Sequence, residues 1–392
     1  MPDLFWLLLP IAAASGWWVA RHAPKGSAHQ GGEPRLDYFK GLNYLLNEQP
    51  DKAIDVFIRL IEVDRETIET HLALGNLFRR RGETERAIRL HQNLIARQTL
   101  TREQRAQALL ELGLDYLRAG LFDRAETLFR ELADADLFRE QALGNLRGIY
   151  ELERDWRQCL EVTRQLAELS GRNLQAEIAH YHCELAEGAL VLGQPAEALE
   201  HVQRALVADP NCVRAALLRG QQEMAEGQWV EALRTLKRIE HQDPAYLAEA
   251  LGLLSECHQK LGRAGEWSQW LGELYRDQQG VALMLAETDL LEREEGKDRA
   301  ALFLLERLQL QPDLRGLERL INLHRGRALM EKQDELLQIM QQLVRRLLDR
   351  LPSYQCGQCG FAARKLHWQC PSCKTWNSVK PVPADGMERR SR

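Results

Sequence analysis

The sequence lacks a surplus of basic charge, and this limits what it can bind. Its 392 residues contain 52 Lys and Arg against 57 Asp and Glu, which gives a formal net charge of −5. A general nucleic-acid-binding protein needs a concentrated basic face, so we expect no nucleic-acid partner. The chain is also not poor in apolar residues: 45% are hydrophobic, which excludes a wholly disordered protein.

The motifs of common enzyme classes are missing as well. There is no G-x-S-x-G nucleophile elbow, no H-E-x-x-H zinc motif and no glycine-rich loop that would cradle a phosphate. We therefore predict that the protein is not an enzyme. Strand-like alternation is also absent from Leu36 onward, where the apolar residues recur at helical spacing. This pattern predicts an all-α fold.

A disulfide framework is another absent feature. Four of the eight cysteines, Cys159, Cys183, Cys212 and Cys257, stand singly within helical stretches. Lone cysteines in amphipathic helices are usually small buried apolar residues, and we predict that role for these four. Without paired cysteines of the secreted type, a reducing compartment is expected.

One charge-free apolar run is present, from Leu4 to Ala20. Its 17 residues would span about 25 Å as a helix, close to the lower limit for crossing a bilayer. Asp3 precedes the run, whereas Arg21 and Lys25 follow it. The positive-inside rule then predicts a transmembrane anchor at residues 1–20, with the N-terminus outside and the rest of the chain cytoplasmic. A cleaved signal peptide is the alternative, but it would carry its positive charge before the apolar run.

A linker rich in Gly and Pro is expected at residues 21–35, and residues 36–350 then carry an internal repeat of about 34 residues. Gly41, Gly75 and Gly113 are each followed by an aromatic residue three positions later and by an alanine twelve positions later. Two antiparallel helices pack closely only where side chains are small, so glycine and alanine are expected where helices cross. The pattern resembles the tetratricopeptide repeat.

Six clear units end at about Pro244, two degenerate units follow around Trp267 and Ala301, and a candidate ninth runs through Leu337. Such an array forms a superhelix whose concave face is lined by the first helix of each unit and typically binds a peptide or partner protein. For each single residue, an ordinary solvated helix face is the alternative. The residues predicted to line this partner-binding groove are Asn76, Arg79, Leu110, Leu114, Leu117, His180, Arg214, Leu217 and Gln221.

The other four cysteines form two close pairs near the C-terminus, Cys356-x-x-Cys359 and Cys370-x-x-Cys373. A C-x-x-C turn directs two thiolates at one metal, and two such knuckles complete a tetrahedron of four sulfurs. We therefore predict one metal ion per chain. Tetrahedral sulfur accepts iron or zinc, so spacing alone does not choose between them. A thioredoxin-like redox pair is the competing interpretation, but it needs a single C-x-x-C in an α/β setting.

The knuckle domain is expected at residues 351–380, followed by a flexible tail at 381–392. Gly360 is expected to adopt a positive φ where the chain turns after the first knuckle. Because only Leu351 to Ser353 lie between the last helical residues and Tyr354, we expect the domain to dock on the last repeats. Apolar cover for so small a domain is expected from Phe361, Trp368 and Trp376.

The stretches CGQCGF and CPSC resemble the knuckles of rubredoxin, which hold a single iron, although the segment between them is shorter here. With the apolar N-terminus and the repeats, they give the whole chain a resemblance to the lipopolysaccharide assembly protein B family of Gram-negative bacteria. That resemblance implies an inner-membrane protein facing the cytoplasm, which promotes degradation of the lipid A pathway deacetylase through the membrane-bound AAA protease. It also implies contact with other lipopolysaccharide synthesis or transport proteins, and it favours iron at the four cysteines.

Residue patterns by themselves leave several functions open. A membrane-tethered adaptor needs no catalytic group and is favoured. A rubredoxin-like electron carrier and a general scaffold with other clients are the alternatives. A nucleic-acid-binding knuckle would depend on Arg364, Lys365 and Lys374, which are too few charges to support it.

Overall fold

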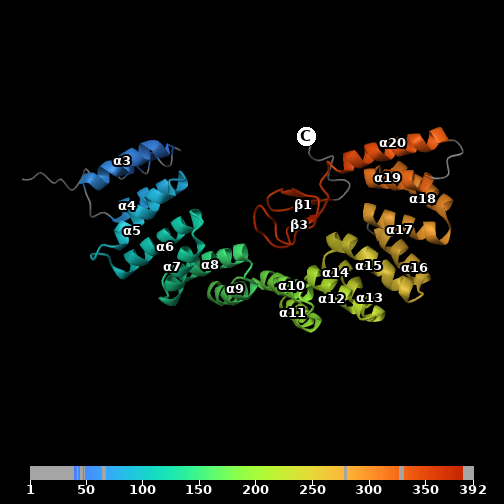
Figure 1. Ribbon diagram of the computed structural model, residues 1–392, viewed down its shortest axis with the longest axis horizontal. Coiled ribbons are helices and arrows are strands. Elements are labelled where there is room, and N and C mark those ends of the chain that lie inside the picture. The colour runs from blue at the N-terminus through green and yellow to red at the C-terminus, as the bar shows by residue number, and fades with distance from the viewer. Residues whose placement is uncertain are drawn as a thin grey trace, which may run out of the picture. The chain divides into compact units, whose positions relative to one another are not determined.

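In the computed structural model the chain is mostly helical, as the repeat pattern predicts (Figure 1). The structure describes residues 39–41, 43–44, 47, 49–63, 68–277, 280–325 and 331–382. The predicted anchor, the linker and residues 383–392 of the predicted tail lie outside these residues. Among the helices that the structure describes, none is both long and apolar enough to span a membrane. The chain divides into two units, Met1–Ile149 and Tyr150–Arg392.

The first unit consists of helices that pack as antiparallel pairs, with α4 against α5 and α6 against α7. Glycine lies where the helices cross, as predicted. A Cβ atom added at Gly75 would lie 2.3 Å from the His91 ring, and one at Gly113 would lie 2.7 Å from Phe129. The described helices of this unit are α3 (Pro50–Val63), α4 (Ile68–Arg80), α5 (Thr84–Ile95), α6 (Arg102–Arg118), α7 (Phe122–Asp134) and the first part of α8 (Arg139–Glu153).

The second unit continues the helix pairs, and α19 packs against α20 in the region of the candidate ninth repeat. Gly193 and Gly227, which share the 34-residue spacing, lie in turns with φ of 72° and 77° rather than at crossings. Its helices are α9 (Trp156–Ser170), α10 (Gln175–Val191), α11 (Pro195–Ala208), α12 (Val213–Ala225), α13 (Trp229–Lys237), α14 (Ile239–Gln242), the 3-10 turn η1 (Pro244–Tyr246), α15 (Leu247–Lys260), α16 (Ala264–Asp277), α17 (Val281–Glu294), α18 (Lys297–Leu310), α19 (Leu314–His324) and α20 (Glu331–Leu348).

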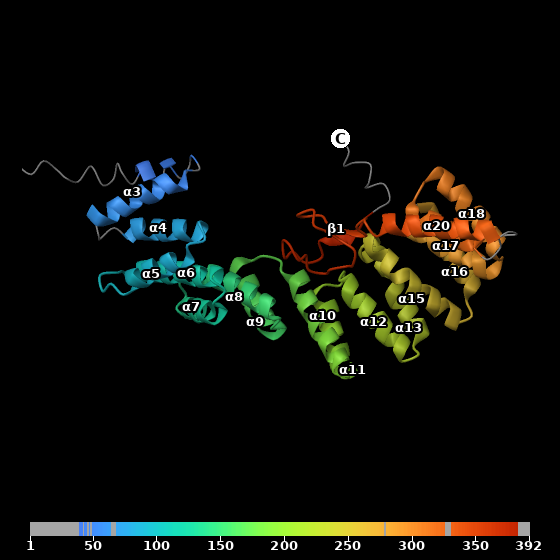
Figure 2. The same ribbon diagram turned by 45° about the horizontal axis from the view of Figure 1, so that its top comes forward.

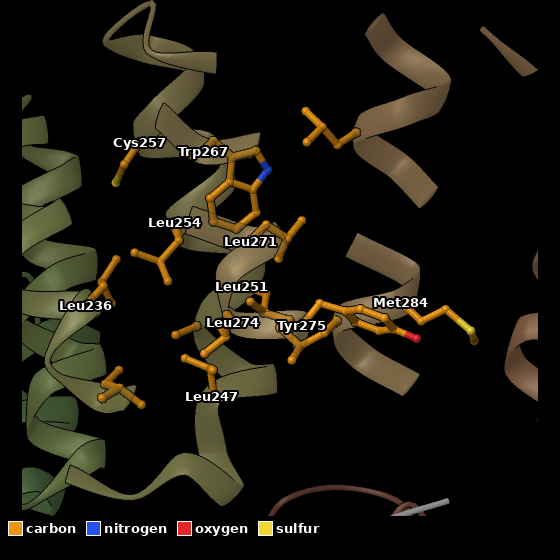
Figure 3. Close-up of a cluster of buried hydrophobic side chains, with 14 of the residues drawn as sticks. Leu236, Leu247, Leu251, Leu254, Cys257, Trp267, Leu271, Leu274, Tyr275 and Met284 are labelled. Atoms are coloured by element: carbon orange, nitrogen blue, oxygen red, sulfur yellow. The ribbon is translucent and has the colours of Figure 1, made fainter. Parts of the chain in front are cut away.

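A continuous apolar core joins the helices of the second unit from α12 to α19. Leu236, Leu254 and Leu271 meet there with no exposed surface (Figure 3). Burying a leucine side chain contributes about 1.5–3 kcal/mol, so three such residues hold α13, α15 and α16 firmly together. Cys257 lies in the same core. The prediction for the lone cysteines is confirmed, because all four side chains are buried.

The C-terminal knuckle domain forms a small antiparallel sheet in the order β2-β1-β3. Its strands are β1 (Tyr354–Cys356), β2 (Ala362–Ala363) and β3 (Val379–Pro381). The all-α prediction is therefore wrong for this domain. Strands of two or three residues are too short to show an alternating pattern in the sequence. Pro381, which the sequence prediction places in the tail, is the last residue of β3.

Candidate metal centre and its docking surface

The four knuckle cysteines converge on one point. The Sγ atoms of Cys356 and Cys373 lie 3.7 Å apart and those of Cys359 and Cys370 lie 3.6 Å apart. All four Sγ atoms lie within 4.8 Å of one another. A metal–sulfur bond of about 2.3 Å implies a tetrahedron edge of roughly 3.8 Å, which agrees with these separations. The four cysteines are thus placed to bind one metal ion.

The two knuckles share one backbone geometry. The amide of Gly360 donates to the carbonyl of Cys356 at 3.0 Å, and the amide of Lys374 donates to the carbonyl of Cys370 at 2.9 Å. Gly360 has a φ of 75°, as predicted. Lys374 occupies the matching position of the second knuckle with a φ of 59°. The sequence did not indicate this, because lysine has no preference for the left-handed region.

The sulfur environments of Cys356 and Cys370 differ. Burial acts to raise the pKa of Cys356. Hydrogen bonds with the Ser378 hydroxyl and the amides of Cys359 and Gln358 lower it by more, so that the pKa is about 6. Burial raises the pKa of Cys370 to about 11. Metal ligands must be thiolates, and a bound cation favours the ionised form of a coordinating thiol. Cys356 therefore offers a thiolate at neutral pH, whereas the Cys370 thiol would ionise on binding.

Trp376 anchors the knuckle domain in an aromatic pocket on the repeats. Its ring stacks on His180 with 5.0 Å between centroids, and it makes edge-to-face contacts with Trp156 and Tyr181 at centroid distances of 6.1 and 5.7 Å. Its indole N–H donates to Glu151 at 3.3 Å. The expectation that Trp376 covers the knuckle is therefore wrong, because the ring faces the helices instead.

Trp368 makes a second anchor beside the first. Its ring lies 5.2 Å from the ring of Tyr246, and the guanidinium of Arg214 lies 6.0 Å above it. Of the three aromatic residues expected to cover the knuckle, Phe361 alone packs against the cysteine cluster. The domain thus places its two tryptophans on the repeats, while Phe361 packs in its own core.

Polar contacts tie the sheet to the same helices. The Tyr246 hydroxyl donates to the carbonyl of Val379 at 3.0 Å, and the Tyr354 hydroxyl donates to Glu249 at 2.7 Å. Burial, followed by the Glu249 carboxylate, raises the pKa of Tyr354 to about 12, so this donor stays protonated.

A further ion pair joins Lys380 to Asp243 at 2.7 Å. The domain therefore docks on the stretch from the end of α8 to the start of α15, in the middle of the repeats (Figures 1 and 2). The expectation that it docks on the last repeats is wrong. A three-residue connection fixes where the domain begins but not the direction in which the chain turns.

Docking covers part of the predicted groove. His180 and Arg214 are each only 3% exposed, because the tryptophans of the knuckle domain lie over them. Arg214 is also held by ion pairs of 2.9 Å with Glu184 and Glu187. These side chains position the knuckle domain and are not open to a client. Leu217, from the same prediction, is buried in the apolar core.

Of the groove residues predicted in this unit, Gln221 is the one that is exposed. The groove residues predicted in the first unit lie on α4 and α6. Arg79 pairs with Glu111 at 2.7 Å and with Asp115 at 2.8 Å.

The other groove residues predicted in the first unit differ in hydrogen bonding and in burial. Asn76 accepts a hydrogen bond of 2.8 Å from Arg79. Leu110 is buried, whereas Leu114 and Leu117 are half-buried. From the predicted groove, Leu114, Leu117 and Gln221 thus keep accessible surface.

Comparison with known proteins agrees with this architecture. Residues 354–381 match a family described as the rubredoxin metal binding domain, and residues 70–106 and 183–246 match tetratricopeptide repeats. Lipopolysaccharide assembly protein B of Escherichia coli K12 is 37% identical over 389 residues, which cover 99% of this chain and 100% of that protein. This chain belongs to the lipopolysaccharide assembly protein B family.

Another member of the family, from Haemophilus influenzae, is 34% identical over 398 residues, covering 97% of this chain and 98% of that protein. A solved tetratricopeptide repeat protein from Parabacteroides merdae is similar at 13% identity, with a TM-score of 0.28 over 75% of this chain and 99% of that chain. A TM-score this low carries no argument about function. The tetratricopeptide repeats and the rubredoxin metal binding domain occur together in this chain, as the family resemblance predicts.

Proposed function

We propose that this family member is a non-catalytic adaptor that regulates lipopolysaccharide assembly. The observation that carries the proposal is the seating of the knuckle domain on His180 and Arg214. It joins the metal site to the repeats as one surface. The charged side chains there serve as contacts: Glu151 holds Trp376, and Arg214 is paired with carboxylates. Such a surface recognises a protein and performs no reaction of its own.

The metal site serves this surface structurally. A bound iron or zinc ion would supply the stabilisation that a three-stranded sheet of this size cannot obtain from its own core. Cys356, Cys359, Cys370 and Cys373 would hold that ion, and the two tryptophans would then keep the folded domain on the helices. In this view the metal sets the shape of the docking surface.

The identity of the client protein and its degradation are inferred from the family resemblance. We propose that the apolar stretch at Leu4–Ala20 anchors the chain in the inner membrane, with the repeats on the cytoplasmic side. A client held close to the membrane reaches an effective concentration near other membrane proteins of the order of millimolar. The lipid A pathway deacetylase is the proposed client, and the membrane-bound AAA protease is the proposed recipient. Other lipopolysaccharide synthesis or transport proteins would gather on the same scaffold.

Photocrosslinking in cells tests the groove directly. A photoreactive amino acid is placed at Leu114, Leu117 or Gln221, and the deacetylase is detected in the crosslinked products. The matched control is Glu168, an exposed position on the second helix of its repeat. The proposal predicts crosslinks from the three groove positions and none from Glu168. Equal yields from all four positions, or no crosslink to the deacetylase, would contradict it.

A further inference from the structure

The last helix, α20, leaves an apolar stripe open to solvent. Terminal repeats of helical arrays normally present a polar outer face, since no further repeat covers them. Here the side of α20 that carries Gln341 and Val344 is buried, at 5% and 7% exposure. The adjacent side is not. Its exposed apolar residues are Leu336 (58%), Ile339 (55%), Met340 (40%), Leu343 (53%) and Leu347 (48%).

The spacing within this stripe is that of a coiled-coil seam. Leu336, Met340, Leu343 and Leu347 follow one another at intervals of four, three and four residues. Apolar residues at alternating intervals of three and four keep one seam facing a partner helix. The order four, three, four also reads the same in both directions. A stripe with this symmetry is self-complementary under a two-fold axis.

We propose that α20 pairs with α20 of a second copy of this chain in antiparallel orientation. The two-fold axis would pass between Met340 and Leu343. Leu336 of one copy then faces Leu347 of the other, and Met340 faces Leu343. This arrangement buries the same stripe on both copies, as an isologous interface requires.

Charge along the helix selects the antiparallel arrangement. Glu335 lies at the start of the stripe, whereas Arg346 and Arg350 lie at its end, and all three are exposed. Arg345 is engaged within its own chain by an ion pair of 2.6 Å with Glu318. Antiparallel pairing brings Glu335 of one copy near Arg346 of the other at both ends of the interface. Parallel pairing would place like charges side by side, which is unfavourable.

The same charges disfavour a lipid surface as the occupant. Helices that lie on membranes carry basic residues along their polar face, which attract anionic headgroups. The stripe of α20 instead has an acidic residue at one end and basic residues at the other. A second copy satisfies both ends. The pairing is independent of the proposed function, since it requires no client.

Crosslinking of the full chain in detergent tests the register. Two differently tagged chains, Leu336→Cys and Leu347→Cys, are mixed and treated with a short bismaleimide. The mixture should give a crosslinked heterodimer, while neither chain should crosslink to itself, because identical positions would be about 16 Å apart along the helix axis. The chain without added cysteine is the control. Self-crosslinking of each variant, or no crosslink in the mixture, would overturn the pairing.

A charge exchange tests the same interface without cysteines. Glu335→Lys or Arg346→Glu alone should weaken self-association several-fold in sedimentation of the full chain, and the double variant should restore it. The double substitution Met340→Glu with Leu343→Glu should give monomers, while the circular dichroism of the helices stays unchanged, because both side chains are exposed. A mass equal to that of the unaltered chain in every variant would show that α20 does not pair.

Discussion

The indole N–H of Trp376 donates a hydrogen bond of 3.3 Å to Glu151, although the two residues are 225 positions apart in the chain. The same carboxylate accepts a hydrogen bond of 3.0 Å from Gln369 and another from the Tyr181 hydroxyl. A buried tryptophan usually finds a partner for its N–H, and here one acidic residue serves the knuckle domain and the repeats together. The knuckle domain is thereby part of the second unit and not an appendage.

Replacing Trp376 with alanine should release the knuckle domain without emptying its metal site. Loss of a central aromatic anchor costs at least about 2 kcal/mol of docking free energy. Hydrogen exchange should increase in α10 and α12, while elemental analysis still finds one metal per chain. Trp270→Ala, at a partly buried position on α16, is the control and should leave exchange in α10 unchanged. Undiminished protection of α10 in the Trp376→Ala chain would contradict this role.

Removal of one knuckle sulfur should abolish metal binding. Cys370→Ser leaves three thiolates, and an incomplete tetrahedral site loses most of its affinity. Cys257→Ser is matched, because both cysteines have no exposed surface. Elemental analysis of purified protein should find one iron or zinc ion per chain for Cys257→Ser and close to none for Cys370→Ser. A full complement of metal in both variants would mean that the knuckles are not the ligands.

The metal ligands and the repeats could be predicted because both are local patterns. Cysteines three residues apart and glycines at helix crossings form patterns that can be recognised within a few dozen residues. The structure places Gly75 and Gly113 where close helix packing requires glycine. The docking surface is different. Tyr246 and Val379 meet across 133 positions, and no periodicity in the sequence records such a contact. The presence of Trp368 and Trp376 in so short a domain was the one sequence feature that pointed to a docking surface. The sequence prediction instead used both as apolar cover for the domain itself.

Acid should weaken the fold through a buried histidine pair. The Nδ1 atoms of His182 and His201 lie 3.1 Å apart. Burial, followed by the charges of His201, Arg164 and Arg204, lowers the pKa of His182 from 6.5 to about 4. Because the folded-state pKa is depressed, the stabilisation is complete above pH 6.5 and is lost as the pH falls towards 4. The loss from this residue is at most about 3 kcal/mol.

Denaturant unfolding at several pH values between 7 and 4.5 measures this dependence. His182→Asn should lose less unfolding free energy over that range than the unaltered chain. His241→Asn, at an exposed position, should follow the unaltered chain. Metal loss at low pH affects all three proteins alike, so the difference between variants isolates the histidine pair. Parallel curves for all three would exclude His182 as a source of the pH dependence.

Two glycine substitutions in the first unit should have opposite effects. A Cβ atom at Gly75 would lie 2.3 Å from Nε2 of His91, whose Nδ1 contacts Asp115 at 2.5 Å. Gly75→Ala should therefore cost about 1–3 kcal/mol, because the buried ring must move. Gly144 in α8 has no atom within 4 Å of such a Cβ. Gly144→Ala should stabilise the helix by up to about 1 kcal/mol. Thermal unfolding that lowers both midpoints equally would contradict the packing described here.

Pulse-chase labelling of the lipid A pathway deacetylase tests the adaptor role most directly. Cells depleted of this protein are complemented with the unaltered chain, with a chain lacking residues 1–20, or with Trp376→Ala. Depletion should lengthen the deacetylase half-life and raise lipopolysaccharide. The unaltered chain should restore rapid turnover, and the two variants should restore it only partly. A deacetylase half-life that does not change on depletion would contradict the proposed role.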